Sequence, residues 1–194
     1  MKKLVTVVFI TISLTALAQD SLQIFNFSRN HIKNTGMEVL GSWAAANITV
    51  GAIGWAGTSG NTRYFYQMNT LWNIANLGAA IAGYTSAQKD KNRQYTPQES
   101  LTEQHKIENI FLFNGILDVT YIGAGFYLKH HGEVKRSDQS SGYGSAIILQ
   151  GAFLLLFDGT MYSSEKHAGS KLKHFLQQNP IIFDGKTIGM ALKL

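Results

Sequence analysis

The charged residues of the chain are confined to a few stretches, and long uncharged segments lie between them. No charged residue occurs in residues 39–62, 64–88 or 139–157, and Asp118 is the single charge in residues 110–128. Each segment approaches the ~20 apolar residues that an α-helix needs to cross the hydrocarbon of a bilayer. We therefore predict an all-α membrane protein, a bundle of four transmembrane helices at about 37–57, 64–87, 107–129 and 142–163.

Two other folds fit the same pattern less well. A soluble four-helix bundle would place a charged face opposite an apolar stripe on each helix, and none of these segments has such a face. A transmembrane β-barrel would require strict alternation over segments of about ten residues. The runs Ala44-Ala45-Ala46 and Ile147-Ile148-Leu149 do not alternate. Small residues such as Gly123-Ala124-Gly125 instead favour helices whose backbones approach closely in lipid.

The first 18 residues have the pattern of a signal peptide. A basic start, Met1-Lys2-Lys3, precedes an apolar run at 4–17, and Ala16-Leu17-Ala18 supplies a small-x-small cleavage pattern. The apolar run is short for crossing a hydrocarbon layer ~30 Å thick. We predict cleavage before Gln19, so that the mature chain begins with a polar or interfacial segment at 19–36. An uncleaved signal anchor is the alternative.

Composition narrows the classes further. The chain has no cysteine, which excludes a disulfide framework, a thiolate metal site and a lipoprotein-type anchor. Its mean hydropathy of −0.03 is low for a multi-pass protein, but the average conceals the segregation just described. The formal net charge of +5 forms no basic run interleaved with aromatic residues, so nucleic-acid binding is not expected. The expected partners are the lipid bilayer and either a second copy of the chain or another membrane protein.

Amide and carboxyl side chains recur at helical spacing inside the predicted spans. Asn69, Asn73 and Asn76, for example, fall at i, i+4 and i+7 on one helix face. Because polar groups are costly in hydrocarbon, such faces should turn toward the bundle interior. They are either interhelical hydrogen bonds that fix the register or the lining of a small polar binding cavity. The candidate binding residues are Asp118, Asn114, Asn47, Asn73, Asn76, Asn69, Gln150 and Asp158.

Asp118 differs from the amides because an unpaired charge at the middle of a span is expensive. No lysine or arginine lies in the interior of the predicted spans to neutralise it. We predict that Asp118 is protonated, hydrogen-bonded by amides such as Asn47 or Asn73, or paired with a cation. Asp158 lies nearer a helix end, where a structural or capping role is expected.

A short internal similarity relates the first and third predicted helices. Asn47-Ile48-Thr49 and Gly54-Trp55 align without gaps with Asp118-Val119-Thr120 and Gly125-Phe126. This pattern suggests two related helical hairpins with Asn47 and Asp118 at matching depths.

The predicted leader and the charges of the connectors indicate opposite orientations. A cleaved signal peptide places the mature N-terminus in the periplasm, and four spans return the C-terminus to that side. Most of the lysines would then lie outside, against the positive-inside tendency. We keep the orientation given by the leader, in the cytoplasmic membrane of a bacterial envelope. Another envelope compartment is the alternative.

No motif indicates catalysis, and an enzyme is not expected. His130-His131 and Glu133 lie in a predicted connector without fixed ligand geometry, so no metal site is predicted. The serines and histidines show no nucleophile–base signature, and no glycine loop for phosphate is present. No cofactor is expected.

The C-terminal region, 164–194, is basic and changes from a helical to a strand pattern. Pro180 ends the helical pattern, and the residues that follow alternate. Ile181-Ile182-Phe183 and the run 187–194 flank Asp184-Gly185, as in a β-hairpin with a two-residue turn. We predict a short hairpin-like tail.

One set of motifs extends through most of the mature chain. Its members are Met37–Trp43, Asn47-Ile48, Tyr64–Asn69, Trp72-Asn73, Phe113-Asn114 with Asp118, and Gln150–Asp158. Together they resemble an uncharacterised family of small bacterial multi-pass membrane proteins. Because that family is a domain of unknown function, the resemblance implies a helical membrane fold and supplies no activity.

Two functional hypotheses follow. The leading one is a multi-pass envelope protein with a structural or protein-interaction role, whose polar faces organise the bundle. The alternative is a small carrier or channel component that moves an ion, a proton or a small polar solute past Asp118. The two differ in their tolerance of Asp118→Asn, which a structural role accepts and an ion site does not.

Overall fold

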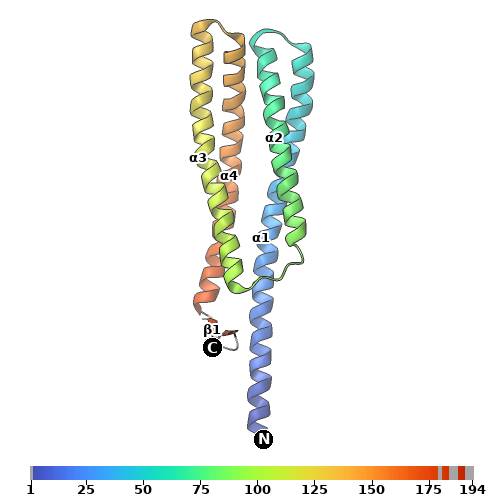
Figure 1. The fold of residues 1–194 in the computed structure, drawn as a ribbon, viewed down its shortest axis with the longest axis vertical. Coiled ribbons are helices and arrows are strands. Elements are labelled where there is room, and N and C mark those ends of the chain that lie inside the picture. The colour runs from blue at the N-terminus through green and yellow to red at the C-terminus, as the bar shows by residue number, and fades with distance from the viewer. Residues whose placement is uncertain (1, 179–180, 184–187, 191–194) are drawn as a thin grey trace.

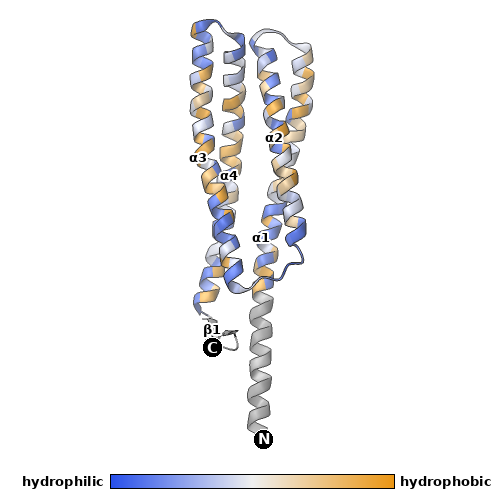
Figure 2. Cartoon of the chain, viewed as in Figure 1, coloured by the Kyte–Doolittle hydropathy of each residue, from blue (hydrophilic) through white to orange (hydrophobic). Residues whose placement is uncertain are grey.

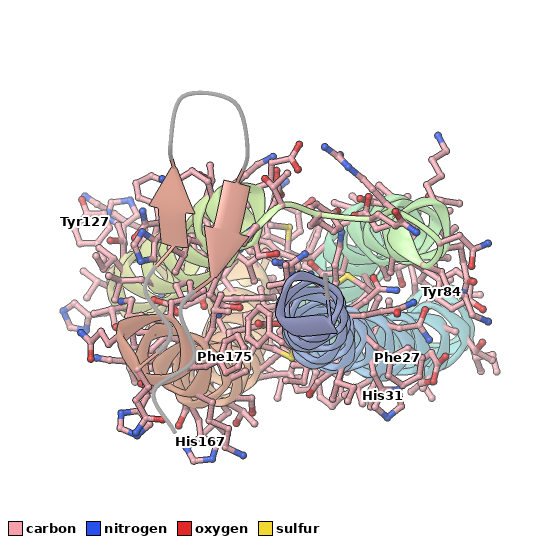
Figure 3. All side chains as sticks on the ribbon, turned by 90° about the horizontal axis from the view of Figure 1, so that it is seen from below. Phe27, His31, Tyr84, Tyr127, His167 and Phe175 are labelled. Carbon is pink, nitrogen blue, oxygen red and sulfur yellow. The ribbon has the colours of Figure 1, made fainter. Side chains whose placement is uncertain are left out.

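Four long α-helices form two antiparallel hairpins that lie side by side (Figure 1). In the computed structural model α1 spans Lys2–Gly57, α2 Gly60–Asp90, α3 Pro97–Lys135 and α4 Asp138–Gln178. The structure describes the backbone of residues 2–178, 181–183 and 188–190 and the side chains of residues 22–178. α1 pairs with α2 and α3 with α4, and the two hairpins meet mainly where α2 and α1 pack on α4. An end-on view shows the two pairs next to each other (Figure 3).

Each helix is longer than the apolar segment from which it was predicted. α1 continues without a break across the predicted junction of leader and mature chain at 18/19, so signal-peptide cleavage stays a prediction. The segment 19–36, expected to be polar or interfacial, is part of the same helix. α4 continues to Gln178 and so includes the start of the predicted C-terminal tail.

Local capping explains why α3 starts earlier than expected. Thr96 accepts a hydrogen bond from the backbone N–H of Glu99, and the Glu99 side chain accepts one from the backbone N–H of Thr96. Pro97 follows the cap residue, where its missing N–H costs nothing. The connector between α2 and α3 is therefore shorter than the sequence predicted.

The connector between α3 and α4 is also shorter than predicted. α3 runs through His130-His131 to Lys135, and the turn is made at Arg136, which has a left-handed backbone with φ 54°. Ser137, the residue before α4, then accepts a hydrogen bond from the backbone N–H of Ser140 in the first turn of that helix. The histidines thus lie on a helix and not in a loop.

Three helices are long and apolar enough to cross a membrane within the part of the chain whose side chains are described. They are α1 from Leu22 to Gly57, α3 and α4. Length and composition therefore support three of the four predicted spans. α2 is not among them, because amides such as Asn69, Asn73 and Asn76 lower the hydropathy of the helix.

The helices are longer than a bilayer requires. The 39 residues of α3 correspond to a length of about 58 Å at about 1.5 Å per residue, roughly twice the thickness of the hydrocarbon. Beyond the hydrophilic residues at the hairpin turns, hydrophobic residues concentrate along one part of the bundle, and polar residues concentrate again past it (Figure 2). We call the second part the polar end; it comprises residues 22–36, 88–107 and 163–178.

A seven-residue repeat forms the contact between α3 and α4. The buried residues of α3 include Gln104, Phe111, Asp118, Gly125 and Gly132, each seven positions after the one before. On α4 the same spacing relates Gly144, Gly151, Asp158, Glu165 and Leu172. A sustained seven-residue spacing is typical of supercoiled helices, which keep one seam in contact along their length.

The glycines in the half of this seam next to the α3–α4 turn allow the backbones of α3 and α4 to approach each other closely. A Cβ on Gly144 would overlap the backbone of Lys129 and Gly125, and a Cβ on Gly151 would lie 3.2 Å from the carbonyl oxygen of Asp118. Gly123, which was expected to have the same role, has open space at the position of a Cβ. Close packing therefore confirms the expectation for some of the small residues only.

Two short strands follow α4. β1, Ile181–Phe183, pairs antiparallel with β2, Ile188–Met190, in the register Ile181↔Met190 and Phe183↔Ile188. The expected turn at Asp184-Gly185 lies outside the described residues. The hairpin-like tail stays a prediction beyond this strand pair.

Candidate functional site

An amide network joins α1, α2 and α4 in the apolar part of the bundle. Trp43 Nε1 donates to Gln150 Oε1 at 3.1 Å, and Gln150 Nε2 donates to Asn69 Oδ1 at 2.6 Å. Asn69 Nδ2 in turn donates to Asn47 Oδ1 at 3.1 Å. The Trp43 ring also stacks on Phe153 of α4. Gln150 is fully buried, so these bonds replace water that a buried amide has lost.

Asn73 and Asn76 extend this network along α2. The Asn73 side chain is fully buried and donates to the carbonyl oxygen of Asn69 at 2.8 Å. Asn76 Nδ2 lies 3.5 Å from Asn73 Oδ1. Of the three alternatives for Asp118, a hydrogen bond from Asn47 or Asn73 does not occur: Asn47 Nδ2 donates to the carbonyl oxygen of Trp43, and Asn73 Nδ2 donates to that of Asn69.

Asp118 is paired instead with Asp158, across the seam between α3 and α4. Asp118 is 2% exposed and Asp158 4% exposed. Their carboxyl groups lie close enough to interact with each other, and Asn114 lies beside the carboxyl group of Asp158. Asp158 was expected near a helix end, with a structural or capping role. The structure instead places it inside α4, which continues to Gln178, and buries it.

Two facing carboxyl groups in a low-dielectric interior cannot both carry a charge without compensation. They can share a proton, or they can hold a cation between them. Asp118 Oδ2 is buried and has no hydrogen-bond partner among the described residues. The same part of the chain contains no group of three or more acidic or histidine side chains that could hold a metal ion. A pair of this kind is suited to a proton or a cation.

A cavity of about 750 Å³ leads to this pair. α2 packs on α1 and α4 while α3 packs on α4, so a space is left between α2 and α3. Asp118 and Asp158 line it together with Asn76 and Asn114. Four of the predicted candidates thus lie around one cavity, whereas Asn47, Asn69, Asn73 and Gln150 lie in the amide network beside it.

Aromatic rings mark the inner end of the cavity. Trp72 of α2 and Tyr121 of α3 are the lining residues farthest from the loop between these helices. Their rings meet edge to face, with centroids 5.0 Å apart. Tyr121 is one helical turn from Asp118, which brings an aromatic surface next to the carboxyl pair.

The other end of the cavity lies in the polar end of the bundle and is lined by paired charges. Lys33 is 3.6 Å from Asp90, and Lys106 is 3.8 Å from Glu103. The guanidinium group of Arg93 lies over the Tyr95 ring. The 12 positions from Lys106 to Asp118 correspond to about 18 Å along α3. The carboxyl pair is thus at the inner end of a deep, apolar-walled space.

A second buried polar cluster occupies the polar end and was missed from the sequence. Arg29 Nη1 donates to the carbonyl oxygen of Ser100 at 3.0 Å, and its guanidinium group lies over the Tyr95 ring. Gln104 Nε2 donates to the backbone oxygen of Glu165 at 2.6 Å. Desolvation raises the pKa of the Glu165 carboxyl to about 7, although Gln104 and Arg29 act in the opposite direction.

The sequence held a signal for this cluster. Glu165 follows Asp158 by seven positions, and Gln104 precedes Phe111 and Asp118 at the same interval. Extending the seam by one heptad past each predicted span would have included both residues. Arg29 has no comparable signal, because it lay outside the segments read as spans.

The bundle, its three helices able to cross a membrane and its buried carboxyl pair define the class as an all-helical protein with candidate membrane spans. Within that class the chain belongs to a family of unknown function, DUF6992, whose model matches residues 39–159. The resemblance to an uncharacterised family is thereby confirmed. The matched range contains the carboxyl pair and the amide network, and it excludes Arg29 and Glu165. No curated protein and no solved structure matches the chain.

Proposed function

We propose that the chain is a multi-pass membrane protein whose cavity exchanges a proton for a small cation at Asp118 and Asp158. The observation that carries the proposal is the contact between two buried carboxyl groups at the inner end of the cavity. Groups of this kind are rare inside membrane proteins and mark ion or proton sites by default. The proposal keeps one part of the carrier or channel alternative, the binding of an ion or a proton, and locates that binding at the carboxyl pair.

The outer surface of the bundle supports a membrane location. Large apolar side chains are exposed along the apolar part of all four helices, which is unusual for a protein surrounded by water. Examples are Val50, Ile53, Ile74, Ile81, Phe113, Ile116, Val119 and Leu156. The Tyr127 side chain projects from the rim of the bundle near one edge of this surface, a position that suits an interfacial anchor (Figure 3).

A structural role in organising the bundle remains part of the proposal, but it belongs to the amide residues and not to the carboxyl pair. Asn47, Asn69, Asn73 and Gln150 satisfy one another and set the register of α1, α2 and α4. Each such hydrogen bond in a membrane contributes about 0.6–2 kcal/mol. The amide network therefore holds the wall against which the cavity forms, while the carboxyl pair carries the chemistry.

The proposed location is a bacterial envelope membrane, with the leader removed and the mature N-terminus in the periplasm. It is supported by the basic start, the apolar run and the small residues before Gln19. A mature chain starting there keeps Leu22 and Arg29, which pack against the rest of the bundle. Expressing the protein in cells that export it and determining the mass of its N-terminal peptide would test whether the leader is removed. A chain that still carries residues 1–18 would contradict the proposal.

Proton release on cation binding tests the function. When a cation binds to a neutral or singly charged carboxyl pair, a proton leaves Asp118 or Asp158 for the solvent. Purified protein in weakly buffered detergent solution is mixed with NaCl, KCl or ammonium chloride while a pH dye is followed. We expect proton release from the wild type with at least one of these salts and none from Asp118→Asn or Asp158→Asn.

Asp138→Asn is the matched control, because Asp138 is an exposed carboxylate at the start of α4 and far from the cavity. It should release protons as the wild type does. Thermal unfolding of each variant shows whether the fold is retained. Equal release by wild type and Asp118→Asn, or no release with any salt, would overturn the proposal.

A further inference from the structure

We infer that the cavity binds an organic ammonium ion with an apolar body, its charged nitrogen at Asp118 and Asp158 and its apolar part between α2 and α3. The inference rests on the proposed function and names the class of ligand. It assigns Asn76 and Asn114 as hydrogen-bond acceptors and Trp72 and Tyr121 as the aromatic surface for the cation.

The carboxyl pair supplies the charge for such a ligand. Asp118 is an almost completely buried residue of the cavity lining, and its Oδ2 atom has no hydrogen-bond partner within residues 22–178. A buried acceptor without a donor is costly, and the N–H groups of an ammonium ion are the donors that would satisfy it. Asn114, beside Asp158, adds a neutral oxygen at the same place.

The lining beside the carboxyl groups suits an ammonium ion better than a bare metal ion. Trp72 and Tyr121 meet at the inner end of the cavity, and aromatic faces attract organic cations. Farther out the walls are aliphatic or aromatic, with Ile107, Ile110 and Phe111. An apolar wall gains free energy from covering a carbon skeleton and none from a hydrated ion.

The volume of the cavity supports the same class. At about 750 Å³ it lies within the range of roughly 300–1,000 Å³ that is usual for sites of small organic ligands. A proton or a monovalent metal ion needs only the immediate surroundings of the carboxyl pair. Anions would be repelled by the carboxyl pair.

The charges at the outer end do not oppose entry of a cation. Lys33 and Lys106 are paired with Asp90 and Glu103, and Arg93 lies near Glu99 at 3.6 Å. The basic groups are thus largely compensated where the ligand would enter. The field that the ligand meets farther in is set by the two carboxyl groups.

The test is calorimetric titration of the full-length protein in lipid nanodiscs with 2-phenylethylammonium. Two probes of the same shape serve as comparisons, the neutral 2-phenylethanol and the anion 3-phenylpropionate. We expect the ammonium probe to bind roughly 10- to 100-fold more tightly than the alcohol, as the loss of one charge-assisted contact implies. The anion should not bind.

Variants locate the site. Asp118→Asn should weaken binding of the ammonium probe by a similar factor and leave binding of the alcohol unchanged. Trp72→Leu should weaken binding of the ammonium probe several-fold, and Asp138→Asn should have no effect. Equal affinity for the ammonium probe and the alcohol would overturn the inference, as would wild-type affinity in Asp118→Asn.

The outcomes separate this inference from the proposed function. If NaCl or KCl releases protons from the pair while 2-phenylethylammonium does not bind, the proposed function stands and the ammonium inference fails. If neither metal salts nor the organic probe releases a proton or binds, both fail. Binding of the organic probe with proton release supports both.

Discussion

Glu165 and Asp118 occupy equivalent positions of the α3–α4 seam but lie in different surroundings. Asp118 is enclosed by the apolar part of the bundle and faces a second carboxyl group. Glu165 lies in the polar end, next to Gln104 and near the charges of Arg29, Glu108 and Lys33. Protonated Glu165 would place a donor beside Gln104, whose Oε1 has no partner in the described part of the chain.

Stability should therefore depend on pH through Glu165. Its pKa is about 7 in the folded protein against an ordinary value of 4.5, so the folded state binds the proton more tightly than the unfolded state. The stabilisation is complete below the ordinary pKa and is lost as the pH rises through about 7. The difference amounts to about 3 kcal/mol at most.

Glu165→Gln should reduce this dependence, and the Asp118–Asp158 pair, which also holds a proton in the folded protein, should supply what remains. Thermal unfolding in detergent between about pH 5 and about pH 8 would show the wild type losing more stability than the variant. Glu38→Gln, at an exposed glutamate of α1, should follow the wild type. A wild-type slope that persists in Glu165→Gln would show that another group is responsible.

Among the residues, the polar candidates were predictable and their partners were not. The spacing of Asn69, Asn73 and Asn76 indicated one helix face, and the cost of a charge at mid-span singled out Asp118. Which groups meet depends on how the hairpins are packed. α2 packs on α4 through Asn69 and Gln150, and Asp118 of α3 therefore has Asp158 of α4 as its neighbour. The spacing of residues within one helix cannot reveal such contacts between helices.

At the level of the elements, the contact between α3 and α4 depends on glycine at specific seam positions. A Cβ at Gly144 would overlap backbone atoms of Lys129, which cannot move without shifting α3. Gly159 lies on the same helix and has open space at its Cβ position. The two glycines therefore form a matched pair for testing the seam.

Gly144→Ala should destabilise the protein by about 1–3 kcal/mol through overpacking. Gly159→Ala should be neutral or stabilising by up to about 1 kcal/mol, because alanine is the better helix former. Melting temperatures in one detergent would compare the two. Equal melting temperatures for both variants would contradict the close approach of α3 and α4 at Gly144.

The helices were predicted in number and order, and their ends were not. Apolar segments report the part of a helix that lipid would surround and contain no information on its extension into water. Thr96-Pro97 with Glu99 was the signal that could have placed the start of α3. For α2, the amides that fill the interior also remove the hydropathy by which a span is recognised.

For the whole molecule, the arrangement of the hairpins predicts which turns share a side of the membrane. The α1–α2 turn and the α3–α4 turn lie at the same end of the bundle, and the α2–α3 loop lies toward the other (Figure 1). The chain has no native cysteine, so single cysteines can be placed and labelled without background. Ser59→Cys, Asn92→Cys and Gln139→Cys report on these three connections.

With the mature N-terminus in the periplasm, an impermeant thiol reagent should label Asn92→Cys in intact cells. Ser59→Cys and Gln139→Cys should react only after permeabilisation. Labelling of Ser59→Cys and Asn92→Cys from the same side would show that α2 does not cross the membrane. Labelling of Ser59→Cys and Gln139→Cys alone would support four spans in the opposite orientation.

The central claim, that Asp118 and Asp158 share a proton which a cation replaces, is tested most directly by infrared difference spectroscopy of the protein in lipid. Addition of 2-phenylethylammonium or a metal salt should remove a carbonyl band of a protonated carboxyl group and produce a carboxylate band. The change should be absent in Asp118→Asn and retained in Asp138→Asn. A spectrum unaffected by every cation, or the same change in Asp118→Asn, would contradict the account.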